Sequence, residues 1–369
     1  MRNPCRILRI ASCALLLTAC QFPGTVRPTV KIGLVAPFEG RYRYIGYDTI
    51  YAVRLALREA NAVGGVGGYS VELAAYDDGA DPGMAVEQAR KLAVDPAVVA
   101  AIGHFREETT GAVLDAYAEA GIPLVSPAVL TPVPDWSDAG LYRVGPTAEV
   151  VGSALFNRLG ELGQHRAALV TAGGPLGEAL QRDARAYGQR TQPVVSPEDA
   201  DWLETVIASR AGVVFCDADP VTAGEIVSAL QAAGWDGVFL GGPELAAADF
   251  RAVAGRAAKG AAFVTPWPFP VDVPGGADFV EAYRTVSNGV PPGPLAVPAY
   301  EATWVLLEAL EQDIAAHGRP SRKGMMEALP DTGRDGLLGT ITFGAAGDWG
   351  AAPLYWYYVG TEGILEYVP

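Results

Sequence analysis

Short apolar segments alternate with segments of helical periodicity along most of this chain, and this alternation constrains the fold more than any other feature. Residues 30–36 read Val-Lys-Ile-Gly-Leu-Val-Ala, which is typical of a buried strand, and residues 47–61 have the apolar spacing of a helix. Strands separated by helices of about 10–15 residues predict a parallel sheet with helices on both faces. We therefore expect an α/β fold.

The alternation occurs in two successive units, so we expect two lobes. In the first unit the expected strands are residues 30–36, 71–76, 98–102 and 122–125, and the helices are 47–61, 82–91 and 109–120. In the second unit the strands are 167–171, 212–216, 237–240 and 261–264, and the helices are 150–162, 176–187, 201–210, 222–233 and 244–254. Beyond these units we expect helices near 277–286 and 299–316 and strands at 338–343 and 354–359.

Three segments flanked by proline or glycine have the composition of hinges between the lobes. They lie near residues 142–146, 265–270 and 351–354. The division that follows assigns residues 30–145 plus 267–350 to lobe 1, and residues 146–266 plus 351–369 to lobe 2.

The first twenty residues predict export and a lipid anchor. Arg2, Arg6 and Arg9 precede an apolar run at residues 10–17, which is about half the length that a membrane-spanning helix needs. Residues 1–19 are therefore expected to be a signal peptide. Cys20 follows Leu-Thr-Ala and resembles a bacterial lipoprotein box, in which Cys20 is lipidated and residues 20–29 form a tether. The alternative is an ordinary signal whose cut falls near a cysteine. Either predicts an extracytoplasmic protein, and the lipidated one is anchored to the cell membrane.

Composition excludes several function classes. With 42 acidic and 27 basic residues the net charge is −15, which argues against nucleic-acid binding. Removing residues 1–19, which hold three arginines and no acid, takes it to −18. Of the four cysteines only Cys216 then remains unmodified, so no disulfide is expected, and its apolar surroundings indicate a buried inert thiol. With three histidines besides, we expect no metal and no cofactor.

Four loops that follow predicted strands are the expected place for a ligand. They are residues 37–46, 103–110, 126–131 and 241–244. In open parallel sheets, ligands bind beyond the carboxyl ends of the strands, beside helix N-termini. The loop at 103–110 opens a helix whose first amides are free to bind an anion.

At these loops the sequence resembles the type-I periplasmic substrate-binding proteins of ABC importers, of the leucine/isoleucine/valine-binding kind. The resemblance covers nearly the whole mature chain. It rests on Lys31-Ile32-Gly33, Asn61-Ala62 with Gly64-Gly65-Val66, Tyr76-Asp77-Asp78 with Asp81-Pro82, Ile102-Gly103-His104, Val125-Ser126-Pro127-Ala128, Ala232-Ala233-Gly234 and Gly242-Pro243-Glu244. It implies two Rossmann-like lobes, joined by a three-segment hinge, that close on an amino acid or related small solute. It also implies an ABC permease as partner, a monomer and no enzymatic activity.

The resemblance places the ligand pocket but also shows a departure there. In the family, the loop after Gly-His supplies a serine and amides to the ligand carboxylate, and Glu107 stands at that serine's place. The family threonine falls on Leu130, and the family aromatic falls on Ile45, beside Tyr44. Glu244 matches the acid that pairs with the ligand ammonium. The candidate ligand-binding residues are Tyr44, Phe105, Arg106, Glu107, Ala128, Val129, Leu130 and Glu244.

Two arrangements of Glu107 follow from this pattern. An anionic side chain facing a ligand carboxylate is repulsive by about a kcal/mol in water, and by more when desolvated. The first hypothesis is therefore a cationic or hydroxyl-rich ligand held by Glu107 and Glu244 from opposite lobes. In the alternative, Glu107 points to solvent beside Arg106, and backbone amides bind a carboxylate.

Other interpretations remain open at this point. Asp217 and Asp219 face the pocket or form a solvated turn, and Trp136 and Trp267 line the cleft or pack at the hinge and surface. His104 is expected to be structural. Besides import, the fold permits a sensor that regulates a partner without transport. A hydrolase on the same scaffold is disfavoured, because the sequence contains no recognisable motif that pairs a nucleophile with a base.

Overall fold

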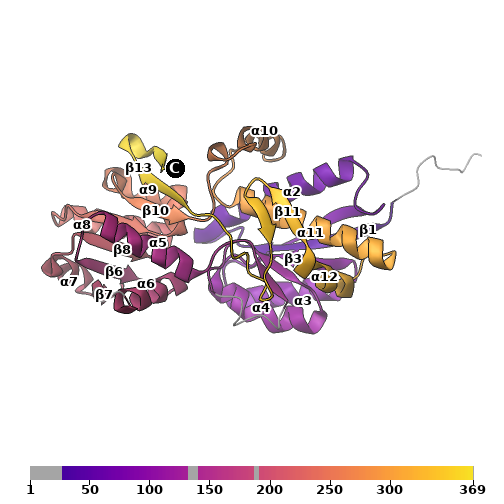
Figure 1. Ribbon diagram of the computed structural model, residues 1–369, viewed down its shortest axis with the longest axis horizontal. Coiled ribbons are helices and arrows are strands. Elements are labelled where there is room, and N and C mark those ends of the chain that lie inside the picture. Colours follow the sequence, from indigo (N-terminus) through magenta and orange to yellow (C-terminus); the bar gives the residue numbers. More distant parts are fainter. Residues whose placement is uncertain (1–26, 132–139, 187–190, 369) are drawn as a thin grey trace, which may run out of the picture.

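The computed structural model describes residues 27–131, 140–186 and 191–368, which form two α/β lobes lying side by side (Figure 1). The sheet of the first lobe has the strand order β2-β1-β3-β4-β5, and all its pairings are parallel. The strands are β1 (Thr29–Ala36), β2 (Ser70–Asp77), β3 (Val98–Ile102), β4 (Leu124–Ser126) and β5 (Leu141–Arg143). The parallel sheet expected from the first unit is confirmed.

Helices cover both faces of this sheet, as the side chains of β1 require. Ile32 and Leu34 pack in the cluster under α2 (Arg43–Ala62) and α11 (Ala296–His317). Val35 points the other way, into the cluster of α3 (Pro82–Val94) and α4 (Glu107–Ala120). The lobe also carries α10 (Gly276–Val286), α12 (Arg322–Ala328) and the hairpin of β11 (Gly333–Gly336) and β12 (Gly339–Thr342).

The second lobe has a seven-stranded sheet in the order β14-β13-β10-β9-β8-β6-β7. Its strands are β6 (Ala167–Thr171), β7 (Thr191–Val195), β8 (Val213–Asp217), β9 (Val238–Gly241), β10 (Ala262–Thr265), β13 (Tyr355–Val359) and β14 (Leu365–Val368). The helices are α5 (Ala148–Glu161), α6 (Pro175–Ala186), α7 (Trp202–Ser209), α8 (Pro220–Ala232) and α9 (Ala248–Ala254). They bury one cluster on each face of the sheet.

The four strands expected in the second unit pair in parallel, and the strand expected at residues 354–359 adds an antiparallel edge to their sheet. β13 pairs antiparallel with β10, and β14 pairs antiparallel with β13. The chain returns from the first lobe just before β13 and enters at the sheet edge without a crossover helix. A short turn at Thr361–Gly363 then gives a hairpin, and a hairpin can join only antiparallel strands.

Arg143, in the first expected hinge segment, pairs with Asp348, which lies three residues before the third expected segment. Its side chain is fully buried at the end of β5, and its Nη2 lies 2.6 Å from Oδ1 of Asp348. The same guanidinium donates to the carbonyl oxygens of Gly145, at 3.2 Å, and Thr131. The segment near residues 142–146, which we expected to be a crossing between the lobes, overlaps the edge strand β5.

Asp48 should make the stability of the first lobe depend on pH. Burial raises the pKa of this α2 carboxyl from 3.8 to about 7, although Gly293 and Leu295 donate backbone hydrogen bonds to it. Between these values the folded chain holds a proton that the unfolded chain has lost. Stability is therefore fully present below the unfolded pKa and is lost as the pH rises through the folded one.

Asp48→Asn should remove this pH dependence. From pH 5 to pH 8 the wild type is expected to lose about 1–2 kcal/mol more unfolding free energy than the variant, a value reduced from the full linkage because Asp48 is partly solvated. Urea unfolding at both pH values checks this. Wild-type and variant profiles that run parallel would contradict it.

Candidate functional site

Two adjoining cavities lie between the lobes, at the carboxyl ends of the parallel strands. The larger has a volume of about 150 Å³ and is lined by the loops after β3, β4, β6, β8 and β9. The smaller, of about 30 Å³, adds Tyr44 and Ile45 from the first loop and shares Glu244 and Trp267 with the larger. We call the two together the interlobe cavity. Each of the four predicted loops contributes to its walls.

Glu244 and Tyr44 meet across this cavity. The Tyr44 hydroxyl donates to Oε2 of Glu244 at 3.0 Å, and the two residues come from opposite lobes. Glu244 lies in a short 3₁₀ turn, Pro243–Ala246, directly after β9. Burial raises the pKa of the Glu244 carboxyl, whereas the Arg106 charge and the Tyr44 hydrogen bond act in the opposite direction. Burial likewise raises the pKa of the Tyr44 hydroxyl well above its usual value.

Arg41 makes a second contact between the lobes, at the rim. Its Nε lies 2.8 Å from Oδ1 of Asp219, and its Nη2 donates to the Thr222 hydroxyl at 2.9 Å. Asp219 also caps α8 by accepting from the amides of Val221 and Thr222. The sequence predicts the strand end that presents Asp219, but no sequence signal indicates that Arg41 reaches it.

Arg106 supplies a positive charge on the first-lobe wall. Its guanidinium lies over the Tyr42 ring, 4.0 Å from the centroid, and its Nη2 is 3.4 Å from a Glu108 oxygen. The residue stands immediately before α4 and does not cap it with its side chain.

The carboxylate of Glu107 is turned toward the loop after β4 rather than toward solvent. Its Oε1 accepts from the amides of Leu130 at 2.5 Å and Thr131 at 3.2 Å, and its Oε2 accepts from the Thr131 hydroxyl at 2.7 Å. Burial raises the pKa of the Glu107 carboxyl above its usual value, although these three hydrogen bonds act in the opposite direction. Thr131, which the sequence does not single out, therefore has a hydroxyl beside Leu130 that is engaged by Glu107.

Asp217 has a corresponding arrangement in the second lobe. Its Oδ2 accepts from the Thr171 hydroxyl at 2.7 Å and from the amides of Gly174 and Gly177, both at 3.1 Å. Both Asp217 and Asp219 line the larger cavity. Of the two alternatives left open by the sequence, the structure favours pocket exposure for both.

The remaining predicted residues separate into three groups. Phe105, Ala128, Leu130 and Trp267 line the larger cavity. Val129 lines neither cavity, because its side chain is only 1% exposed. Trp136 and Cys20 lie outside the described residues.

His104 is structural, as predicted. It is fully buried between Asp78 and Tyr117, with ring nitrogens at 2.8 and 3.2 Å from their oxygens.

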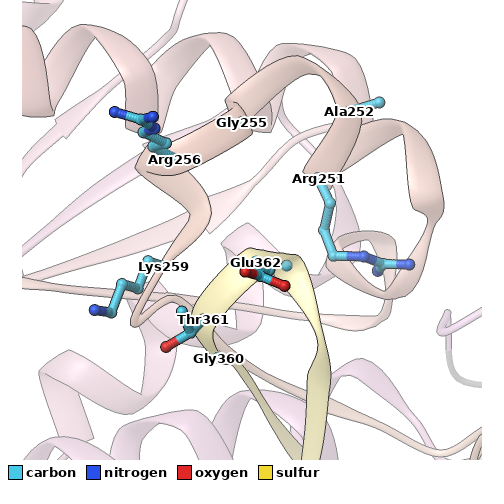
Figure 2. A pocket seen from close by; sticks show the side chains of 9 residues that line it. Arg251, Ala252, Gly255, Arg256, Lys259, Gly360, Thr361 and Glu362 are labelled. Carbon is cyan, nitrogen blue, oxygen red and sulfur yellow. The ribbon is translucent and has the colours of Figure 1, made fainter.

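A larger hollow on the second lobe lacks the features of a ligand site. It measures about 680 Å³ and lies between α9 and the turn before β14. Figure 2 shows that the Arg251 and Arg256 side chains point away from one another, so their charges do not converge. Convergent polar groups are what distinguish a binding pocket from a surface hollow.

Two searches over the described residues gave no candidates. In residues 27–131, 140–186 and 191–368, no group of three or more His, Cys, Asp or Glu side chains is placed to hold a metal ion. Over that same part of the chain, every helix is too short or too polar to cross a membrane.

The fold and the interlobe cavity define a two-lobed binding protein. The family model described as periplasmic binding protein matches residues 29–363, and the chain belongs to this family of binding proteins. The resemblance in the sequence and the α/β fold class are thereby confirmed.

Named relatives and solved structures agree with this assignment. The leucine-, isoleucine-, valine-, threonine- and alanine-binding protein of Pseudomonas aeruginosa is 24% identical over 87% of each chain. Leu/Ile/Val-binding protein homolog 2 of Brucella abortus is 25% identical over 97% of each. The fold is also that of LivJ from Streptococcus pneumoniae in complex with isoleucine, with a TM-score of 0.81 and 21% identity over 92% of this chain and 99% of that one. A solute-binding protein from R. palustris in complex with benzoate has a TM-score of 0.77 and 20% sequence identity, over 92% of this chain and 95% of that one.

Proposed function

We propose that this protein binds a small polar solute, an amino acid or a related compound, between its lobes and delivers it to an ABC permease. Relatives of similar length carry names of amino-acid-binding proteins, and similar structures include ABC transporter substrate-binding proteins. The Leu-Thr-Ala-Cys20 sequence supports an extracytoplasmic site of action with lipidated Cys20 as membrane anchor. The observation that carries the proposal is the interlobe cavity, whose two walls meet at Tyr44 and Glu244.

The proposed mechanism is closure of the lobes over the solute, with no covalent step. Hinge closure around ligands is the established motion of periplasmic binding proteins. A solute can favour the closed state only by binding it more tightly than the open one. Tyr44, Phe105, Arg106, Ala128 and Leu130 act from the first lobe and Glu244 from the second, so complete contact requires closure.

Mass spectrometry of small molecules released from protein purified from its native host tests this proposal. We expect one small solute in roughly stoichiometric amount, and we expect the same compound to raise the thermal unfolding midpoint when added back. An absence of released solute, together with no thermal shift across a broad panel of amino acids and amines, would contradict the proposal.

Arg41→Gln should weaken solute binding modestly. The contacts of Arg41 to Asp219 and Thr222 exist only while the lobes are together, so their loss disfavours closure. The Arg41 side chain is 44% exposed, and ion pairs at exposed positions contribute about 0–1 kcal/mol. We therefore expect the affinity to fall by about two- to fivefold.

Arg43→Gln is the matched control for this change. Arg43 is exposed in the same segment, and its hydrogen bond goes only as far as the Gly40 carbonyl. Calorimetric titration of both variants should show a loss for Arg41→Gln alone. Equal affinities for the two variants would show that the rim contact does not contribute to closure.

A further inference from the structure

On each wall of the interlobe cavity, one cluster of donor groups is already occupied by a carboxylate of the protein itself, whereas the Trp267 indole N–H has no partner among the described residues. On the first-lobe wall, Glu107 accepts the amides of Leu130 and Thr131 and the Thr131 hydroxyl. On the second-lobe wall, Asp217 accepts two amides at the start of α6 and the Thr171 hydroxyl. Such clusters of converging N–H and O–H groups bind anions. Here they hold internal anions in place of a solute anion.

The charges that remain also disfavour an anionic solute. Among the described residues that line the larger cavity, five carry carboxylates and one, Arg106, carries a positive charge. The carboxylates belong to Glu107, Glu108, Asp217, Asp219 and Glu244, of which Asp219 is paired with Arg41 at the rim. Arg106 already lies over the Tyr42 ring and beside Glu108. A solute carboxylate would face repulsion from several of these groups, and the low dielectric of a closed cavity strengthens each term.

Glu244 is the acid best placed to receive a cation. Its Oε2 accepts from Tyr44, and no protein donor to its Oε1 is found among the described residues. Buried carboxylates need a partner, and a solute ammonium would supply the charge and the donors that this oxygen lacks.

From this geometry we infer that the solute is a small primary amine without a free carboxylate, of the amino-amide or alkylamine class. The inference rests on the proposed solute-binding function and specifies its substrate class. Glu107 is the specificity-determining residue: it rejects amino acids by filling the donor cluster that their carboxylate would need. The volumes of about 150 and 30 Å³ limit the solute to a small one.

Matched pairs of amino acid and amino amide test the substrate class. L-leucine and L-leucinamide have nearly the same shape and the same ammonium, but only leucine has a carboxylate; alanine and lysine provide further pairs. In calorimetric titrations we expect at least one amide to bind, and to bind at least tenfold more tightly than its acid. An acid that equals or exceeds its amide, or a panel in which no amine binds, overturns the inference.

Glu107→Ser tests the cause of the preference. Removing the carboxylate frees the amides of Leu130 and Thr131, so we expect leucine affinity to rise at least tenfold while leucinamide affinity changes less than threefold. Glu119→Ser is the control, because it removes the same charge from an exposed position of α4 that lines neither cavity, and it should affect both ligands alike and by less than threefold. Equal changes for leucine in the two variants would overturn the role of Glu107.

Two safeguards keep this test independent of folding and of the proposed function. Glu107→Gln keeps the side-chain length and should give an intermediate leucine affinity, and thermal unfolding of each variant checks that it is folded. A released native solute that carries a carboxylate, or that is uncharged, would overturn the inference and leave solute binding itself intact.

Discussion

Glu244→Gln is expected to weaken solute binding by at least about 100-fold, or roughly 2.7 kcal/mol. Truncating one member of a buried, hydrogen-bonded charge pair typically costs about 2–5 kcal/mol, because the other charge is left without a partner. Glutamine retains an oxygen that accepts the Tyr44 hydroxyl, so the substitution removes the charge while the contact between the lobes is kept. The measurement is calorimetric titration with the solute released from the native protein.

Two further variants define what this loss means. Tyr44→Phe removes only the hydrogen bond to Glu244, so a smaller loss of about three- to tenfold is expected from the usual value of one hydrogen bond. Glu225→Gln, at an exposed position on α8, should leave affinity unchanged. If Glu244→Gln binds within threefold of the wild type, the carboxylate is not a ligand contact, and the proposed site is wrong.

Arg143→Met is expected to lower the unfolding free energy by about 3–5 kcal/mol, the range seen when one partner of a buried ion pair is removed. The guanidinium is fully buried and satisfies Asp348 and the carbonyl oxygens of Thr131 and Gly145. Methionine fills much of the same volume but leaves those acceptors without donors. The loss of stability therefore reflects the missing hydrogen bonds and ion pair more than a change in packing.

Urea unfolding of Arg143→Met beside Asp348→Asn checks this expectation. Asp348 is about one quarter exposed, and asparagine retains an oxygen that accepts from Arg143, so this control should cost less than about 1.5 kcal/mol. A loss below about 1 kcal/mol for Arg143→Met would contradict a structural role for Arg143 at the end of β5.

Local chemistry allowed most elements to be predicted from the sequence. Asp81 followed by Pro82 predicts a helix start, and the Asp81 side chain indeed accepts from the Met84 amide at 2.7 Å. The apolar run around Cys216 predicts a buried strand, and Cys216 is 1% exposed. These signals act within a few residues, so they can be recognised without knowing the rest of the fold.

Elements without a local signal could not be predicted. β14 carries exposed side chains with no clear alternation, and its strand form depends on pairing with β13. α12 has only seven residues, too few for a period to emerge, and it is fixed by the Ser321 cap and by packing beneath α11.

The site shows the same limit more sharply. The loops that line the cavity follow from the positions of the strands, but the partners of the charged side chains do not. Glu107 is 24 residues from Thr131, and Arg41 is 181 residues from Thr222. Their contacts depend on how the loops and lobes are placed in three dimensions. The sequence therefore indicated that Glu107 is unusual, and the structure showed what it binds.

Small-angle X-ray scattering of the protein, stripped of solute and then saturated with the solute released from the native protein, tests most directly that two lobes close over a small guest. Closure predicts a smaller radius of gyration in the saturated sample than in the stripped one. At a solute concentration that saturates the wild type but not Arg41→Gln, the radius of gyration of the variant should change less. Superimposable scattering profiles, recorded where calorimetry shows the wild-type site to be filled, would contradict hinge closure.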